Sequence, residues 1–190
     1  MLSMQKYIVI VMLCGIRLVA NSQNDSVEKS IFGIQTGFLG IWAHQELRLS
    51  NSIALRTELG LDGGLWGGSL YDKTGFLLAP VITAEPRWYF NLKKRVSKSK
   101  RIDGNSGNFL SIKSSYHPDW FVLSNYDDIS IVSDLSIIPT WGLRRNIGSR
   151  LNFETGIGFG YAYLFSKKAG YPENEGHSTV NLHLRIGYRF

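Results

Sequence analysis

Ionisable side chains recur at alternate positions of several apolar segments, and they are the residues of this 190-residue chain best suited to chemistry. Carboxylates and guanidinium groups held close together can pass protons or ions along a narrow path, or they can lock one another into salt bridges. Both signs are present, at Glu46, Arg48, Arg56, Glu58, Glu85, Arg87, Asp134, Arg144, Glu154 and Arg185, and His44, Lys113 and His183 follow the same alternation. The spacing therefore predicts strands with one charged face.

Three other groupings could bind or react, and each has a simpler reading. Glycines at 156, 158 and 160 look like a phosphate-binding loop, but no helical pattern follows them, so small residues on a strand are favoured. His177 and Ser178, with Glu175 nearby, could belong to a lipid A-modifying hydrolase, although near-adjacent residues show no mutual reach. Asp127, Asp128 and Asp119 could bind a hard cation, but a solvated acidic loop is favoured.

We therefore expect no catalytic, cofactor-binding or metal-binding residues, and no enzyme. The hydrolase is kept as the exception to this expectation.

The elements that must position the charged residues are clearest at the end of the chain. In the segment 179–190, written TVNLHLRIGYRF, apolar residues fill every even position. Side chains of a strand point to opposite faces with a period of two, so this segment has one apolar face and one face with a histidine and two arginines. A strand of 9–11 residues crosses a bilayer when tilted, and this segment has that length. Its apolar face is therefore expected to contact lipid.

Similar alternation predicts eight strands, at residues 31–38, 41–49, 53–62, 76–92, 108–117, 129–144, 150–165 and 178–190. The apolar parity changes near Leu39 and Gly40, which indicates a tight hairpin, with a bulge in one long strand as the alternative. Pro80 and Pro86 interrupt the predicted fourth strand, and we expect local bulges there. The glycine-rich stretch 63–75 and the stretch 93–108 are expected to be a loop and a turn.

The N-terminus has the features of a cleavable signal peptide over residues 1–22. Lys6 precedes an apolar run that is too short for a spanning helix, and Ala20 and Ser22 occupy the positions that a signal peptidase reads. Cys14 is the single cysteine, so a mature domain 23–190 would have no disulfide. A lipoprotein is disfavoured because Leu13 precedes Cys14 where a small residue is required.

The formal charge of +6 does not indicate a nucleic-acid partner. Of 21 basic residues, two lie in the signal segment and six in the run 93–101, which leaves 13 against 15 acidic residues elsewhere. A nucleic-acid interface would spread basic residues and aromatic platforms over one face. The basic run is expected to be a solvated turn that helps to fix orientation; contact with lipid phosphates or periplasmic polymers is the alternative.

Aromatic residues near the ends of polar-in, apolar-out strands are typical of outer-membrane barrels. From residue 31 onward, the sequence resembles the small eight-stranded outer-membrane β-barrel family of Gram-negative bacteria, the OmpA and OmpX class. The terminal residues 187–190 carry the most specific likeness, and the resemblance implies that Tyr188 and Phe190 form a signal for the barrel-assembly machinery. It also implies an antiparallel up-and-down transmembrane β-barrel in the cell outer membrane, in contact with lipid and lipopolysaccharide.

An eight-stranded barrel has room inside only for side chains, so we expect the charged face to form a plug of salt bridges rather than a wide pore. Glu46 with Arg56, and Glu58 with Arg48, are the expected cross-strand pairs. The expected role is structural or surface interaction through outward-facing loops, with an unidentified extracellular partner. The alternative is a secreted soluble lipid-binding barrel, which would turn the apolar residues inward and alternate just as strictly.

Overall fold

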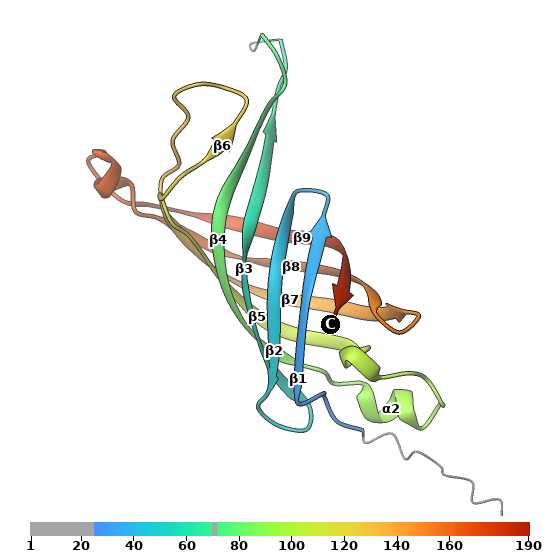
Figure 1. Cartoon of the computed structure of the whole chain (residues 1–190). Coiled ribbons are helices and arrows are strands. Elements are labelled where there is room, and N and C mark those ends of the chain that lie inside the picture. Colours follow the sequence, from blue (N-terminus) through green and yellow to red (C-terminus); the bar gives the residue numbers. More distant parts are fainter. Residues whose placement is uncertain (1–24, 70–71) are drawn as a thin grey trace, which may run out of the picture.

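The computed structural model describes residues 25–69 and 72–190, and these residues form one antiparallel β-sheet with short helices (Figure 1). The predicted signal peptide and its cleavage site lie outside the described residues. The strands are β1 (Ser30–Gly37), β2 (Gly40–Arg48), β3 (Ile53–Trp66), β4 (Gly75–Trp88), β5 (Asn108–His117), β6 (Leu123–Ser124), β7 (Asp134–Ile147), β8 (Leu151–Leu164) and β9 (Glu175–Arg189). The helical elements are α2 (Leu92–Val96) and the single-turn helices η1 (Asp103–Asn105) and η2 (Ser166–Ala169).

The long strands close into a ring. Each pairs with its neighbours in sequence, and the ring order is β1, β2, β3, β4, β5, β7, β8 and β9, with β9 returning to β1. The two-residue β6 attaches to β4 outside this ring. The predicted all-β fold with a ring of eight antiparallel strands is confirmed.

The first two strands form a hairpin, which decides between the two interpretations of residues 31–49. Gly37 pairs with Gly40, so that only Phe38 and Leu39 form the turn. A side chain at Gly40 would collide with the carbonyl of Leu61, and its φ of +142° lies in a region that favours glycine. The change in apolar parity is therefore a chain reversal and not a bulge.

Several predicted boundaries are wrong, for reasons of pairing. Residues 63–66, predicted as loop, continue β3 because Gly63 and Gly64 pair with Leu78 and Leu77 across the hairpin. A backbone ladder needs no side chains, so glycine does not end a strand that has a partner. Residues 129–133, predicted as strand, precede β7 because β5 pairs with β7 only as far as His117 and Asp134.

The prolines are accommodated without the predicted bulges. The β3–β4 register runs without a shift through both Pro80 and Pro86. The pairing of β4 with β5 skips Pro86, and the pairing of β7 with β8 skips Pro139, while the opposite edge of each strand stays paired. At Pro86 and Pro139, the local loss of pairing on one side thus replaces a bulge, while Pro80 lies outside the β4–β5 pairing, which begins at Ile82.

The inner face of the ring is polar and the outer face is apolar, whereas a water-soluble protein has its apolar face inside. On β9, Arg185 is buried inside whereas Leu182 is 77% exposed outside. The outward parity on the other strands is similarly apolar, for example at Phe32, Ile41, Leu59, Ile82, Ile112, Ile137 and Phe159. Polar side chains therefore fill the interior and apolar side chains cover the outside.

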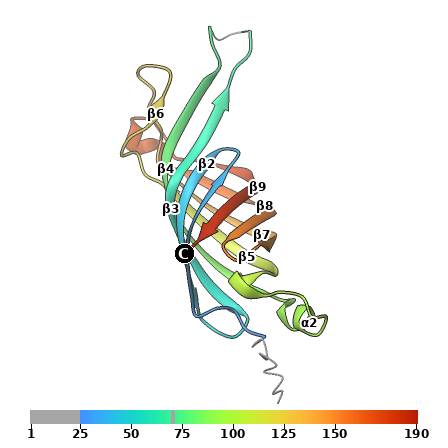
Figure 2. The same ribbon diagram turned by 45° about the vertical axis from the view of Figure 1, so that its right-hand side comes forward.

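One end of the ring is covered by the connection between β4 and β5. Here α2 and η1 lie across the strand ends, near the C-terminus (Figures 1 and 2). The basic run, predicted as a solvated turn, therefore contains a helix, because Leu92 and Ile102 are buried against an apolar cluster. That cluster comprises Val27, Ala54, Tyr89, Leu92, Ile102 and Phe109. We call this the plug end.

The opposite end carries the β3–β4 hairpin, the β5–β7 connection that contains β6, and the β8–β9 connection, and it is called the loop end. The β3–β4 hairpin extends far beyond the tip of the β1–β2 hairpin (Figure 1). Within the described residues, no helix is long and apolar enough to span a membrane.

Candidate functional site: the charged interior

Eight charged side chains occupy the middle of the ring, and all are at most 3% exposed. They are the arginines Arg56, Arg87, Arg144 and Arg185 and the glutamates Glu46, Glu58, Glu85 and Glu154. They come from inward-pointing positions of strands β2, β3, β4, β7, β8 and β9. Since four charges of each sign are present, the formal charge of this cluster is zero.

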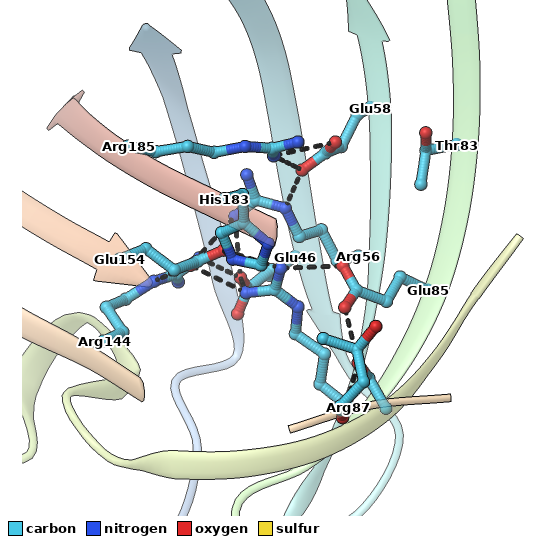
Figure 3. Close-up of polar contacts among 12 residues, drawn as sticks. Glu46, Arg56, Glu58, Thr83, Glu85, Arg87, Arg144, Glu154, His183 and Arg185 are labelled. Carbon is cyan, nitrogen blue, oxygen red and sulfur yellow. Dashed lines mark hydrogen bonds and ion pairs between the residues drawn. The ribbon is translucent and has the colours of Figure 1, made fainter. Parts of the chain in front are cut away.

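The eight side chains form one continuous chain of ion pairs with alternating sign (Figure 3). It begins at Arg185, whose guanidinium lies 2.8 Å from Glu58. The chain then follows Glu58, Arg56, Glu46, Arg144, Glu154, Arg87 and Glu85. Charges removed from water are tolerated when each has a partner, and here each carboxylate contacts at least one arginine.

Glu46 is a junction of this network. Its carboxylate lies 2.7 Å from Arg144, 3.1 Å from Arg56 and 3.5 Å from Arg87. It also accepts hydrogen bonds from the Tyr89 hydroxyl at 3.1 Å and the Asn105 amide at 2.8 Å. The network therefore joins several strands to the plug end.

Neutral residues complete the hydrogen bonding and were not among the predicted site residues. Gln35 accepts a hydrogen bond from Arg56 at 2.6 Å and donates one to Asn152 at 2.9 Å, and Ser111 donates to Glu85 at 2.6 Å. These three share the inward parity of their strands, which is a usable sequence pattern. Asn105 lies in η1, where no periodicity indicates which way a residue points.

Two predicted members of the interior network, Arg48 and Asp134, lie apart from it. Arg48 is half-buried at the end of β2 opposite Ala54, so the predicted pair of Glu58 with Arg48 is wrong. The residue directly across from Glu58 is His44 rather than Arg48. The Glu58 carboxylate forms ion pairs with Arg56 and Arg185. The predicted pair of Glu46 with Arg56 is directly cross-strand in the register.

Asp134 belongs to a second polar cluster, nearer the loop end. Its carboxylate lies 3.0 Å from one ring nitrogen of His117, and Asp62 lies 3.1 Å from the other. Asp62 also accepts a hydrogen bond from the Trp42 indole. Among residues 25–69 and 72–190, no group of three or more histidine, cysteine or carboxylate side chains has the arrangement of a metal site.

The remaining candidate groupings have no reactive geometry. His177 lines the interior while the adjacent Ser178 must point to the opposite face of β9, so the imidazole cannot serve that hydroxyl as a base. Gly156 and Gly158 lie in β8, where an added Cβ would meet His183 and the Pro139 carbonyl. They allow neighbouring side chains and strands to approach closely.

The predicted assembly residues lie on the outer face at the plug end. The ring of Phe190 stacks on Phe32 with centroids 5.5 Å apart and contacts Tyr188 edge-on at 5.3 Å. The Phe190 backbone N–H donates to the Phe32 carbonyl at 3.0 Å. The terminal aromatic pair therefore closes the seam between the first and last strands.

Comparison with known proteins adds no family to this description. No family model matches the sequence, and neither the curated proteins nor the solved structures searched include a significant match.

Proposed function

We propose that this chain is an integral outer-membrane β-barrel protein with a structural or surface-interaction role and no wide pore. The observation that carries the proposal is the reversed polarity of the two faces. Large apolar side chains such as Leu182 and Phe159 stand on the outside, while Arg56 and Glu154 are fully buried. A bilayer favours this arrangement, because lipid accepts the apolar side chains and a closed ring satisfies the backbone.

The same polarity disfavours a soluble lipid-binding barrel. Such a barrel would hold its ligand against inward-facing aliphatic side chains and leave the charged parity in water. Here the inward parity in the centre of the ring is polar, and the charge network fills the space in which an apolar ligand would lie.

The interior also argues against diffusion through the barrel. Side chains fill an eight-stranded barrel, and here the central ones are held by ion pairs on all sides. A passing solute would have to separate buried charges, which is unfavourable because each would lose its counter-ion away from water. The long connections at the loop end would then provide the surface for interaction.

The proposal is tested by migration on a gel and by conductance. Unboiled protein extracted from an outer-membrane fraction should migrate differently from boiled protein, as folded barrels do in detergent. In a planar bilayer, it should show no stepwise conductance. Identical migration, purification as a monodisperse monomer without detergent, or sustained channel openings would each overturn part of the proposal.

A further inference from the structure

The wall of the ring has a lateral gap on the loop-end side. Strand β1 pairs with β9 only from Gly33 with Arg189 to Gly37 with Arg185, whereas β9 continues to Glu175 with β8 as its only neighbour. On the other side, β2 reaches only Asp62 of β3, which continues to Trp66. The β1–β2 hairpin thus ends before the strands on either side of it, and in Figures 1 and 2 its tip lies well short of the tip of the β3–β4 hairpin.

A cavity of about 340 Å³ occupies this gap. Both the outward residues Leu182 and Leu184 and the inward residues His183 and Arg185 of β9 line it. A cavity that touches both faces of one strand passes around the edge of that strand. The barrel interior therefore communicates sideways with the apolar outer surface.

The rim of the gap is strongly apolar. Phe38 in the hairpin turn is 88% exposed, and Leu182 is nearly as exposed. In a bilayer, these side chains would contact hydrocarbon, and an alkyl chain lying in the gap would contact them in the same way.

The inner end of the cavity holds a buried lysine that has no close partner. Lys113 reaches this cavity from β5, and it also lines an adjoining interior cavity of about 330 Å³. Its residue is only 9% exposed. None of the ion pairs or side-chain hydrogen bonds between described residues involves its ammonium group, although the carboxylates of Glu58 and Asp62 attract it from a greater distance. A buried charge without a close counter-ion is costly, so an anion placed directly against the ammonium group would be favourable.

The other charged groups around the cavity are already paired. Arg185 binds Glu58 and lies 3.9 Å above the Trp42 ring, while Asp62 contacts Trp42 and His117. Lys113 is therefore the charged group of this cavity that has no close partner.

We propose that this gap is a binding site for a single-chain amphiphile with an anionic head group. The head group pairs with Lys113 inside the ring, and the alkyl chain passes Leu182 and Leu184 into the surrounding hydrocarbon. This inference rests on the proposed membrane location. A strand from a second copy could also occupy the free edge of β9, but an uncharged backbone would leave Lys113 unpaired.

Binding of radiolabelled hexadecanoate to the full mature chain in nonionic detergent tests the site. We expect saturable binding of one molecule, with no competition from hexadecanol, which lacks the charge, or from acetate, which lacks the chain. Lys113→Met should weaken binding at least tenfold, while Lys113→Arg should retain it. Leu182→Trp should obstruct the gap, whereas Ile137→Trp, an outward substitution on β7, should not.

Several outcomes would overturn the inference. These are the absence of saturable binding, equal binding by Lys113→Met, or effective competition by hexadecanol. Efficient cross-linking between molecules that carry Leu182→Cys would assign the gap to a second copy. Gel migration of the same samples separates the two proposals: a heat-modifiable protein that fails to bind refutes only the binding site, whereas loss of heat-modifiability removes both.

Discussion

Arg87 and Glu154 form a two-point ion pair across the barrel interior, with both terminal nitrogens of the arginine 2.8 Å from the two carboxylate oxygens. Their strands, β4 and β8, lie on different sides of the ring. Such a pair fixes geometry as well as charge, because the planar guanidinium matches the carboxylate. The barrel is therefore braced across its width and not only around its wall.

We predict that Glu154→Gln lowers the free energy of unfolding by about 3–5 kcal/mol, because it leaves three buried carboxylates to balance four buried arginines. Urea titration of the folded fraction in lipid vesicles measures the change. The double variant Arg87→Met with Glu154→Gln should lose less than the sum of the single variants, since it restores charge balance. Arg150→Met, at an exposed surface position, is the control for loss of an arginine. An equal loss in this control would contradict the prediction.

A second prediction concerns the close approach of β7 and β8. We expect Gly158→Ala to destabilise the barrel by about 1–3 kcal/mol, as overpacking commonly does. The added Cβ would lie 2.5 Å from the Pro139 carbonyl oxygen, which is backbone and cannot turn away. Gly64→Ala is the matched control, because its Cβ would lie at an ordinary 3.4 Å from Leu77. Similar urea midpoints for the two variants would show that the interface can relax.

A third prediction concerns pH and the plug end. Burial alone would raise the pKa of Asp103, but hydrogen bonds from Arg101 and Asn146 and the charge of Arg189 lower it below its ordinary 3.8. Because its pKa is lower in the folded state, the charged Asp103 carboxylate stabilises the fold fully at pH values above the unfolded-state pKa. This stabilisation is lost as the pH falls through the folded-state pKa.

Asp103→Asn should therefore cost about 1 kcal/mol or less at neutral pH, because these ion pairs are partly exposed. The difference from the unmodified chain should shrink as the pH falls below 3.8. Urea titrations of both proteins across this range provide the measurement, with Asp119→Asn in an exposed loop as the control for charge. A difference that stays constant down to the lowest pH would refute the assignment.

The fourth prediction separates assembly from stability. If Phe190 is part of what the assembly machinery reads, Phe190→Ala should strongly reduce the amount of folded barrel in the outer membrane. The ring is 71% exposed, so its removal should cost much less than the about 3–5 kcal/mol of a buried phenylalanine. Phe165→Ala is the control, because Phe165 also contacts two aromatic rings near a strand end. Comparable membrane levels of both variants would exclude an assembly signal.

The sequence was sufficient for the parts of this fold that depend on local periodicity. Alternation identified which side chains face inward, and adjacency of two strands brought Glu46 and Arg56 together. It could not find the contact between Glu58 and Arg185, because β3 and β9 are not neighbours and meet only through the stagger of the closed ring.

The plug end was missed for a different reason. Residues 93–108 are polar enough to resemble a solvated turn, and the few apolar residues that anchor them, such as Leu92 and Ile102, show no period. The direction of Asn105 depends on a left-handed turn at Gly104, with φ of +58°. The conformation of such irregular backbone is determined by tertiary contacts, which the periodicity of the sequence does not reveal.

The seam between β1 and β9 has a consequence for the order of folding. It contains five residue pairs, against fourteen between β8 and β9, and it joins segments about 150 residues apart in the chain. Closing so long a loop costs more chain entropy than forming any hairpin, and few contacts compensate for it. The sheet should therefore assemble from its hairpins and join its two edges last, so that forced unfolding begins by separating β1 from β9.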